Sequence, residues 1–184
     1  MVKFYTRDGD DGYTGRLGEG RLPKHHKVIE TVGTIDEASA VLGLARGTCR
    51  APMIADLILP VQRDLYHMMA EISATPEAAP RFRVIDAAKV EWLEGQIDSL
   101  GAFVTVPADF IVAGDTAGGA ALALARTAVR KAERRVAELH HEGEVSNLEL
   151  IRYLNRLSSL CFILELHENQ FGGVNQPTIA KTGE

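Results

Sequence analysis

The chain has 184 residues, 46% of them hydrophobic and 24% charged, and its formal net charge is −5. This length predicts a single domain with a substantial core, and the mildly acidic balance argues against a nucleic-acid partner, which needs a basic protein surface. The N-terminus has no apolar signal core and no stretch has the length of a membrane span, so we expect a cytoplasmic protein with no membrane partner. The cysteines, Cys49 and Cys161, have neither a metal-ligand spacing nor a disulfide framework, and Cys161 falls at an apolar helical position.

Residues 1–25 have no helical periodicity and include the glycine-rich run TRDGDDGYTGRLGEGR. Successive glycines let backbone N–H groups turn toward one centre, which is typical of an anion-binding nest. Thr6 and Thr14 add hydroxyls to this loop and Lys24 adds a positive charge, whereas the GK[ST] ending of a Walker loop is missing. A flexible surface terminus is the alternative interpretation of the same run.

A calcium loop is a second alternative, with Asp8, Asp10 and Glu19 at positions one, three and twelve of an EF-hand. Against it, Gly12 brings no side-chain oxygen to position five, and Tyr13 replaces the turn glycine at position six. No helical pattern leads into the loop either, so the calcium interpretation is disfavoured.

Five amphipathic helices are predicted, because apolar residues recur at alternating steps of three and four along most of the remaining chain. They cover residues 26–46, 53–74, 86–100, 119–140 and 146–166. Pro60 predicts a kink or a late start in the second helix, and Asp86 is the expected N-cap of the third. Ser146 and Glu149 form a capping box for the fifth. Asp36 lies beside the apolar face of the first helix, where a salt bridge is the plain expectation.

The fourth predicted helix carries Arg126, Arg130 and Arg134 one turn apart. Three side chains spaced in this way span roughly 80° of a helix surface, so they can converge on one object. Guanidinium groups suit phosphate oxygens, because the planar fork donates two parallel hydrogen bonds and keeps its charge. The alternative is a solvated face in which Arg134 and Glu138 form an ordinary ion pair.

Short connections, with no strand alternation and no repeats, predict an all-α fold, an up-and-down five-helix bundle. We expect an anion-binding loop over residues 1–25, the bundle over residues 26–168, and a polar tail over residues 169–184 that is disordered in isolation. The apolar connection that contains Phe110 is expected to pack across one end of the bundle or to border a pocket.

Several segments, in this order and spacing, resemble the PduO-type ATP:cob(I)alamin adenosyltransferases from residue 4 to about residue 166. They are YTRDGDDGYTG, VGTIDE, FIVAG followed by ARTAVRKAERR, and YLNRLSS. The resemblance implies an enzyme that transfers the 5′-deoxyadenosyl group of ATP to cob(I)alamin, giving adenosylcobalamin and tripolyphosphate. It also implies a homotrimer with the ATP site between neighbouring subunits, Mg²⁺ bound with ATP, and two partners, a cobalamin reductase and a B12-dependent acceptor enzyme.

The resemblance assigns roles to residues at matching positions. ATP binding would fall to Thr6, Arg7, Asp8, Gly9, Thr14, Gly15, Lys24, Arg130, Lys131, Glu133, Arg134 and Asn155. The catalytic residues would be Arg130, Arg126 and Asp36, with Arg126 and Asp36 paired across a subunit boundary. Phe110 corresponds to an aromatic side chain that walls the corrin site, and Ser159 belongs to the same cobalamin-binding side. Because cob(I)alamin itself attacks C5′ of ATP, no protein nucleophile is needed.

Two positions depart from the family pattern. Lys131 replaces the second arginine of Arg-Arg-Ala-Glu-Arg, and Ser159 replaces the aspartate of Asn-Arg-Leu-Ser-Asp. The lost carboxylate leaves open a non-catalytic relative that binds ATP or cobalamin. A third hypothesis is an all-α nucleoside triphosphate pyrophosphatase, for which Glu91 and Glu94 supply one acidic pair although no Glu-x-x-Asp follows.

Overall fold

The computed structural model describes residues 3–181, and the all-α prediction of five helices is confirmed. The helices are α1 (Lys27–Thr48), α2 (Pro52–Ser73), α3 (Ala87–Gly101), α4 (Ala117–His141) and α5 (Glu149–Phe171). The smaller elements are a 3₁₀ helix, η1 (Ala79–Phe82), and two short strands before α1, β1 (Tyr13–Gly15) and β2 (Arg21–Pro23). Within residues 3–181, no helix has both the length and the apolar character that crossing a membrane requires.

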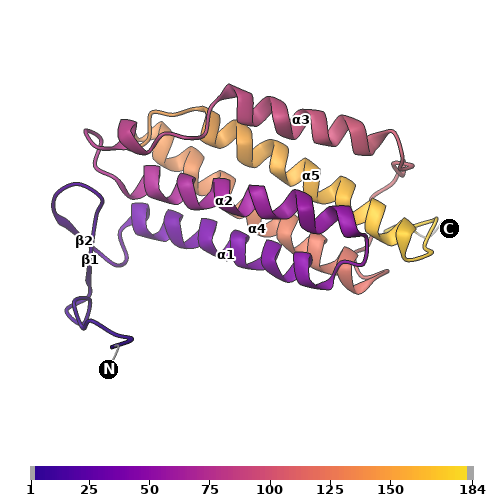
Figure 1. Cartoon of the computed structure of the whole chain (residues 1–184), viewed down its shortest axis with the longest axis horizontal. Helices are drawn as coiled ribbons and strands as arrows, with labels where there is room; N and C mark the ends of the chain where they lie inside the picture. The colour runs from indigo at the N-terminus through magenta and orange to yellow at the C-terminus, as the bar shows by residue number, and fades with distance from the viewer. Residues whose placement is uncertain (1–2, 182–184) are drawn as a thin grey trace.

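The helices lie side by side along one axis (Figure 1). α4 packs against both α1 and α5, while α2 packs against α1 and α3 against α5. The seam of α4 is fully buried, as at Leu122, Val129 and Val136, because apolar side chains three and four residues apart share one face. Burial of this seam sets the direction in which the polar flanks of α4 and α5 point.

Two glycines let α4 and α5 approach closely at one end of the bundle. A Cβ at Gly118 would lie 2.6 Å from Glu168 Oε1, and a Cβ at Gly119 would collide with Asn169. The Thr116 hydroxyl accepts from Gly119 N at 2.9 Å as the N-cap of α4 and donates to Asn169 Oδ1 at 2.7 Å. The start of α4 is therefore held directly by the last turns of α5.

The start of α2 is also stabilised from α5. The N-cap of α2, Ala51, makes no side-chain hydrogen bond. Instead the buried Glu168 carboxylate accepts from the backbone N–H groups of Arg50 (2.9 Å) and Ala51 (3.1 Å). The helix then continues from Pro52 through Pro60, so the late start that Pro60 suggested does not occur.

The two predicted caps have different outcomes. Asp86 is the N-cap of α3, as predicted, and its carboxylate accepts a first-turn N–H at 3.0 Å. The capping box between Ser146 and Glu149 is wrong, because α5 begins only at Glu149 and the Asn147 side chain accepts the Glu149 N–H at 3.1 Å. Asn147 is fixed in this place by donating to the Ile85 carbonyl at 3.0 Å.

The N-terminal arm is more regular than its composition predicts. β1 and β2 pair antiparallel, with Thr14 opposite Leu22, although the sequence shows no strand alternation and residues 1–25 were expected to form a glycine-rich loop. Glycines with positive φ angles make the turn between the two strands possible. The Arg16 guanidinium ties the hairpin to the end of α2 by donating to the carbonyls of Ser73 (3.3 Å) and Ala74 (2.7 Å). The residues before β1 project away from the bundle (Figure 1).

The polar tail after α5 returns along the loop that precedes α4. Ala180 N donates to the Phe110 carbonyl at 2.7 Å, and the Asp115 carboxylate accepts from both the N–H (3.0 Å) and the hydroxyl (2.7 Å) of Thr178. These contacts give the described part of the tail a defined position, although we expected the tail to be disordered in isolation. Residues 182–184 of the predicted tail lie outside the described part of the chain.

Candidate active site

A hollow of about 540 Å³ opens where the loop before α4 lies over α4 and α5. Its lining includes Phe110, Arg126, Arg130, Ser158, Ser159 and Phe162. Four residues that the sequence pointed to for catalysis or cobalamin binding, two arginines, one aromatic and one serine, therefore share one cavity. Sequence reasoning missed Ser158 and Phe162, although their spacing of four residues on α5 is a signal that they share a face.

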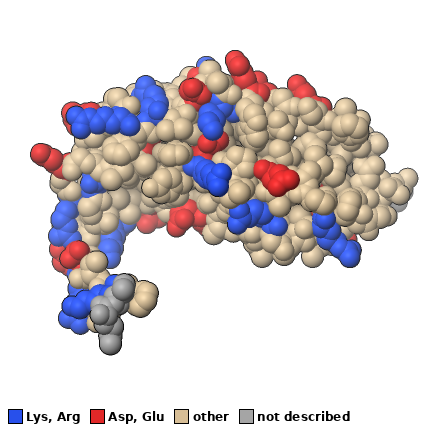
Figure 2. Space-filling model, viewed as in Figure 1, with Lys and Arg blue, Asp and Glu red and all other residues tan. Residues whose placement is uncertain are grey.

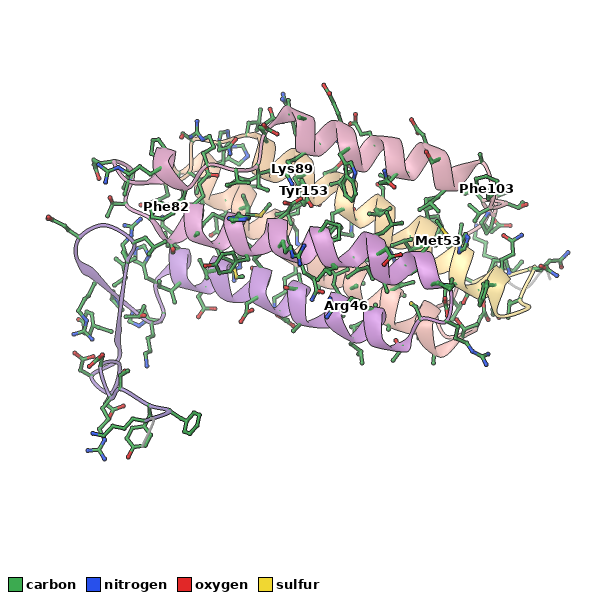
Figure 3. All side chains as sticks on the ribbon, in the orientation of Figure 1. Arg46, Met53, Phe82, Lys89, Phe103 and Tyr153 are labelled. Carbon is green, nitrogen blue, oxygen red and sulfur yellow. The ribbon has the colours of Figure 1, made fainter. Side chains whose placement is uncertain are left out.

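Phe110 is presented at the tip of the loop, where its side chain is 88% exposed. Figure 3 marks Phe103 in the same loop, at the end of the bundle where the C-terminus also lies. A phenylalanine this exposed gains nothing from core packing, so its ring is available to contact a ligand or a partner at the edge of the hollow.

α4 supplies both arginines of the hollow. Ala125 and Val129 are fully buried in the seam, which leaves Arg126 partly buried and Arg130 exposed on the adjoining flank. Arg126 Nε is buried without a hydrogen-bond partner, and neither guanidinium forms an ion pair with a residue in the range 3–181. Asp109 also lines the hollow, but neither arginine is paired with it, so two cations that form no ion pair within this range lie beside an apolar wall and can attract an anion.

A chain of polar contacts joins three helices beside the hollow. Asn155 of α5 donates to Glu133 of α4 at 2.8 Å and accepts from Arg156 Nη1 at 2.9 Å. Arg156 Nε in turn donates to Glu94 of α3 at 2.8 Å. The predicted nucleotide residues Glu133 and Asn155 are thus held in fixed orientations. Sequence reasoning named Glu94 only for the pyrophosphatase hypothesis and missed its contact with Arg156, because no local pattern pairs residues 62 positions apart.

Lys131 and Arg134 are outside the hollow. Lys131 Nζ donates to Glu37 of α1 at 2.7 Å, with both side chains about half exposed, so it points toward α1. Arg134 is exposed two turns after Arg126. Glu138 pairs with Arg135, three residues before it, at 2.9 Å. The alternative pairing of Glu138 with Arg134, four residues before it, is therefore wrong.

The N-terminal loop is compact around Lys24. A Cβ at Gly9 would lie 2.7 Å from Lys24 Nζ, so the absence of a side chain at Gly9 allows this approach. Thr6 Oγ1 accepts from Asp8 N at 3.3 Å, and Arg7 between them has a φ of 70°, a conformation that few residues other than glycine adopt. Thr6, Arg7, Asp8, Gly9 and Lys24 therefore lie within one small loop that exposes a lysine.

Within one chain, the arm lies at one end of the bundle, and the loop before α4, which lines part of the hollow, lies at the other end (Figure 1). Thr14 and Gly15, in β1, lie with the arm. Figure 2 shows basic side chains gathered along the arm, whereas the far end of the bundle is largely uncharged on this face. Asp36 is exposed on α1 and makes no salt bridge within residues 3–181, so the salt bridge expected for it does not form inside the chain. Asp36 and Arg126 are both left with unpaired charges.

A second polar cluster lies inside the bundle, away from the hollow. The Tyr153 hydroxyl donates to Asp64 at 2.9 Å, and Lys89 Nζ donates to the other oxygen of the same carboxylate at 2.8 Å. Figure 3 shows Lys89 and Tyr153 close together in the body of the bundle. Burial, followed by the neighbouring Asp64 charge, raises the pKa of Tyr153 above its usual value. The cluster ties α2, α3 and α5 together and is structural.

Comparison with known proteins gives one family. A family model described as cobalamin adenosyltransferase matches residues 4–168. The corrinoid adenosyltransferase PduO of Citrobacter freundii is 36% identical over 169 residues, which make up 91% of this chain and 50% of that protein. The corrinoid adenosyltransferase of Mycobacterium tuberculosis is 34% identical over 180 residues, 95% of this chain and 92% of that protein. The chain spans about half the length of the PduO relatives that it matches.

Solved structures share the fold. A variant of the PduO-type ATP:corrinoid adenosyltransferase of Lactobacillus reuteri, complexed with cobalamin and ATP, matches with a TM-score of 0.88 at 25% identity. The match covers 98% of this chain and 100% of that one. A second variant of the same enzyme, also complexed with cobalamin and ATP, has a TM-score of 0.88 at 27% identity and covers 98% and 97% of the two chains.

Proposed function

The chain belongs to the cobalamin adenosyltransferase family, and on that premise we propose that it transfers the 5′-deoxyadenosyl group of ATP to cob(I)alamin. The products are adenosylcobalamin and tripolyphosphate. One observation carries the proposal: a single hollow combines an apolar wall that includes Phe110 with the unpaired guanidinium groups of Arg126 and Arg130. The apolar wall suits the face of a corrin ring, and the two cations suit a triphosphate.

The reaction places most of its demands on position and charge. A Co–C bond forms at C5′ of ATP, and the C5′–O bond to the triphosphate breaks, with its electron pair leaving on tripolyphosphate. Cob(I)alamin is the nucleophile, so the protein has to hold ATP in line with cobalt and exclude water. Arg130, exposed at the hollow, is placed to stabilise the charge that develops on the leaving group, and Arg126 adds a second cation.

Mg²⁺ belongs to the proposal as the ion that arrives with ATP. When bound, it neutralises part of the triphosphate charge. Among residues 3–181, no group of three or more His, Cys, Asp or Glu side chains is placed to hold a metal ion. Mg²⁺ is commonly held through substrate phosphates and water, with few protein carboxylates. We accordingly assign it to the phosphate oxygens of ATP.

We also propose a homotrimer with each ATP site between two subunits. Two observations support it: the N-terminal arm lies at the end of the bundle opposite the loop that lines the hollow (Figure 1), and Arg126 and Asp36 form no salt bridge within residues 3–181. In the trimer, the loop around Thr6 and Lys24 wraps the triphosphate beside a neighbour's arginines. Asp36 then pairs with Arg126 of the neighbouring subunit, while Asn155 lies near the nucleotide.

Phe110 is assigned to the corrin side. Its exposed ring can exclude water and a lower axial ligand from cobalt, and a four-coordinate Co(II) accepts an electron more readily. The tail holds the backbone of this residue through the hydrogen bond from Ala180 N (2.7 Å). Ser159, at the rim of the same hollow, offers a hydroxyl to a corrin side chain.

The proposed reaction needs two partners. A reductase has to deliver the electron that makes cob(I)alamin, and a B12-dependent enzyme has to accept the product. We place the protein in the cytoplasm, where reducing conditions suit its free cysteines, Cys49 and Cys161.

The test is an adenosyl-transfer assay with purified protein, MgATP and chemically reduced cobalamin. We expect the visible spectrum of adenosylcobalamin to appear together with one tripolyphosphate for each product molecule, and neither to appear without protein. ATP binding without product would indicate a non-catalytic relative. Release of pyrophosphate from ATP would indicate a pyrophosphatase, in which Glu94 would have to leave its contact with Arg156. Either result overturns the proposal.

A further inference from the structure

Glu165 is a buried carboxyl group that the proposed reaction does not yet use. It lies on α5, seven residues after Ser158, so the two residues share the helix face that borders the hollow. The residue is only 2% exposed, and its Oε1 has no hydrogen-bond partner among residues 3–181. A buried carboxyl oxygen without a partner is costly, so a contact that forms in another state of the protein is the natural explanation.

The neighbouring polar residues of α5 do have structural roles. Glu168 accepts two backbone N–H groups before α2, and Asn169 accepts from the Thr116 hydroxyl. Both therefore hold helix ends together. Glu165, one turn before Asn169, has no such task in the described chain.

Arg126 is the matching group on α4. Its Nε is the buried edge of the guanidinium and also has no partner, while its side chain lines the hollow. Burial raises the pKa of Glu165 to about 7, against the pull of the Arg126 cation and with a further push from Asp115. Gly118 and Gly119 of α4 pack against Glu168 and Asn169 of α5, so two turns further along this pair of helices Arg126 lies near the level of Cys161 and Glu165. The Arg126 cation lowers the pKa of the Cys161 thiol and the Glu165 carboxylate raises it.

We propose that Glu165 is a positioning residue for Arg126: its carboxylate accepts the buried Nε–H and thereby aims the other two guanidinium nitrogens into the hollow. Both atoms are buried without a hydrogen-bond partner among residues 3–181, and the Arg126 cation favours the ionised form of Glu165, so a rotation of the guanidinium toward an anion in the hollow would let this hydrogen bond form. A guanidinium can serve both sides, because its five N–H groups point along different edges of one plane.

The inference rests on the proposed function, since the anion that Arg126 meets in the hollow is the triphosphate of ATP or Asp36 of a neighbouring subunit. The proposed function already pairs Arg126 with Asp36 of a neighbouring subunit. The inference adds Glu165 as an acceptor for the buried Nε–H of the same guanidinium. The groups that act on Glu165 are Arg126 from α4, Asp115 from the loop before α4, and Cys161 on its own helix. Only Arg126 favours the ionised carboxylate.

The first test measures the contact without using the reaction. Glutamate labelled at the side-chain carboxyl carbon allows Glu165 to be titrated by NMR, and Glu165→Gln identifies its signal. Arg126→Met removes the attracting charge, so the titration midpoint of Glu165 should rise by about one pH unit or more. Arg135→Met, on an exposed part of α4, is the control and should leave the midpoint unchanged. An unchanged midpoint in Arg126→Met, with the helical circular dichroism retained, overturns the inference.

The second test compares pH profiles of adenosyl transfer. At about pH 8, Glu165→Gln should lower kcat/KM for ATP roughly tenfold or more, as for loss of a charge-assisted hydrogen bond. Near pH 6 the wild-type carboxyl is protonated as well, so the two proteins should agree within about twofold. Glu168 is the neighbouring buried glutamate. Glu168→Gln should keep the wild-type dependence of kcat/KM on pH between about pH 6 and pH 8, even where it lowers the stability of the protein.

The outcomes of the two tests are distinguishable. If kcat/KM of Glu165→Gln depends on pH in the same way as that of the wild type, the proposed positioning role is wrong. If the wild-type protein makes no adenosylcobalamin, the proposed function fails, and the NMR titration still decides whether Glu165 and Arg126 interact.

Discussion

Arg126 and Arg130 lie one turn apart on α4, yet their surroundings differ. Arg126 is partly buried, with its Nε enclosed, whereas Arg130 is exposed at the opening of the hollow. Arg130 is therefore free to follow a ligand, while burial of Nε restricts the movement of Arg126. Two arginines of one helix thus suit different tasks, contact with the triphosphate and organisation of the site.

Arg130→Ala should abolish adenosyl transfer mainly through loss of ATP binding. A charge-assisted hydrogen bond of this kind contributes roughly 1.5–3 kcal/mol, so the affinity for MgATP should fall at least about tenfold. Titration calorimetry measures it. Arg135→Ala is the matched control, because that residue pairs with Glu138 on the surface and should bind MgATP like the wild type. An unchanged affinity in Arg130→Ala would contradict the assignment.

Ser159→Asp should improve adenosyl transfer more than it changes ATP affinity. The serine is exposed at the hollow, one turn after Asn155, and it can hydrogen-bond but brings no charge. A carboxylate there could anchor Arg156 or a corrin side chain. Turnover with saturating MgATP and a separate ATP titration measure the two effects, with Ser159→Asn as the uncharged control. Lower turnover in Ser159→Asp, or a change in ATP binding alone, would show that this position does not serve the corrin side.

At the scale of elements, α5 organises both the core and the site. Its last turns hold the start of α2 through Glu168 and the start of α4 through Asn169. Its middle turns carry Ser158 and Phe162 into the hollow. The same helix therefore couples the stability of the bundle to the geometry of the cavity.

Glu168→Ala should lower the free energy of unfolding by roughly 2–4 kcal/mol. The change removes two charge-assisted hydrogen bonds and leaves the N–H groups of Arg50 and Ala51 without their acceptor beside a buried cavity. Urea unfolding followed by circular dichroism is the measurement. Glu149→Ala, on the same helix but paired with Arg152 at the surface, should cost less than about 1 kcal/mol. Equal losses in the two variants would mean that Glu168 is not a structural anchor.

The seam between α4 and α5 also predicts how stability depends on pH. The pKa of Glu165 in the folded protein is raised from 4.5 to about 7, so the folded state holds a proton that the unfolded state releases. Stability should therefore fall as the pH rises from about 4.5 to about 7, by up to roughly 3 kcal/mol from this group. Glu165→Gln should flatten this part of the profile and be the more stable protein near pH 8. Parallel profiles for the two proteins in chemical denaturation would refute this.

At the scale of the whole molecule, the residues proposed for ATP fall into two groups, one on the N-terminal arm and one on α4 and α5. The arm lies at one end of the bundle (Figure 1), and the second group includes Arg130 in the wall of the hollow. The proposed symmetric assembly would bring the arm of one copy to the hollow of another.

The proposed subunit boundary is tested by a charge swap between Asp36 and Arg126. Asp36→Arg or Arg126→Asp alone should weaken the trimer and its activity, because two charges of one sign would then meet at the proposed boundary and repel, and the double variant should recover part of the loss. Sedimentation and the adenosyl-transfer assay report the two effects. Glu37→Gln is the control, since Glu37 pairs with Lys131 inside its own chain. Additive losses without recovery would argue against a direct pair.

The sequence by itself determined the five helices, the N-cap at Asp86 and the spacing of the arginines on α4. These features are local, because a helical face depends on residues three and four apart and a cap depends on one turn of backbone. Motif order was enough to indicate the family, since several short segments in sequence are jointly specific.

Only the tertiary structure decided which of these residues meet. It turned Lys131 toward Glu37, buried Glu165 on the face of α5 that packs against α4, and laid the tail along the loop of Phe110. The capping of α5 and the pairing of β1 with β2 were likewise settled by contacts with other parts of the chain. Each of these outcomes depends on partners far apart in sequence, and periodicity within one helix does not specify which distant side chain, backbone group or glycine lies opposite.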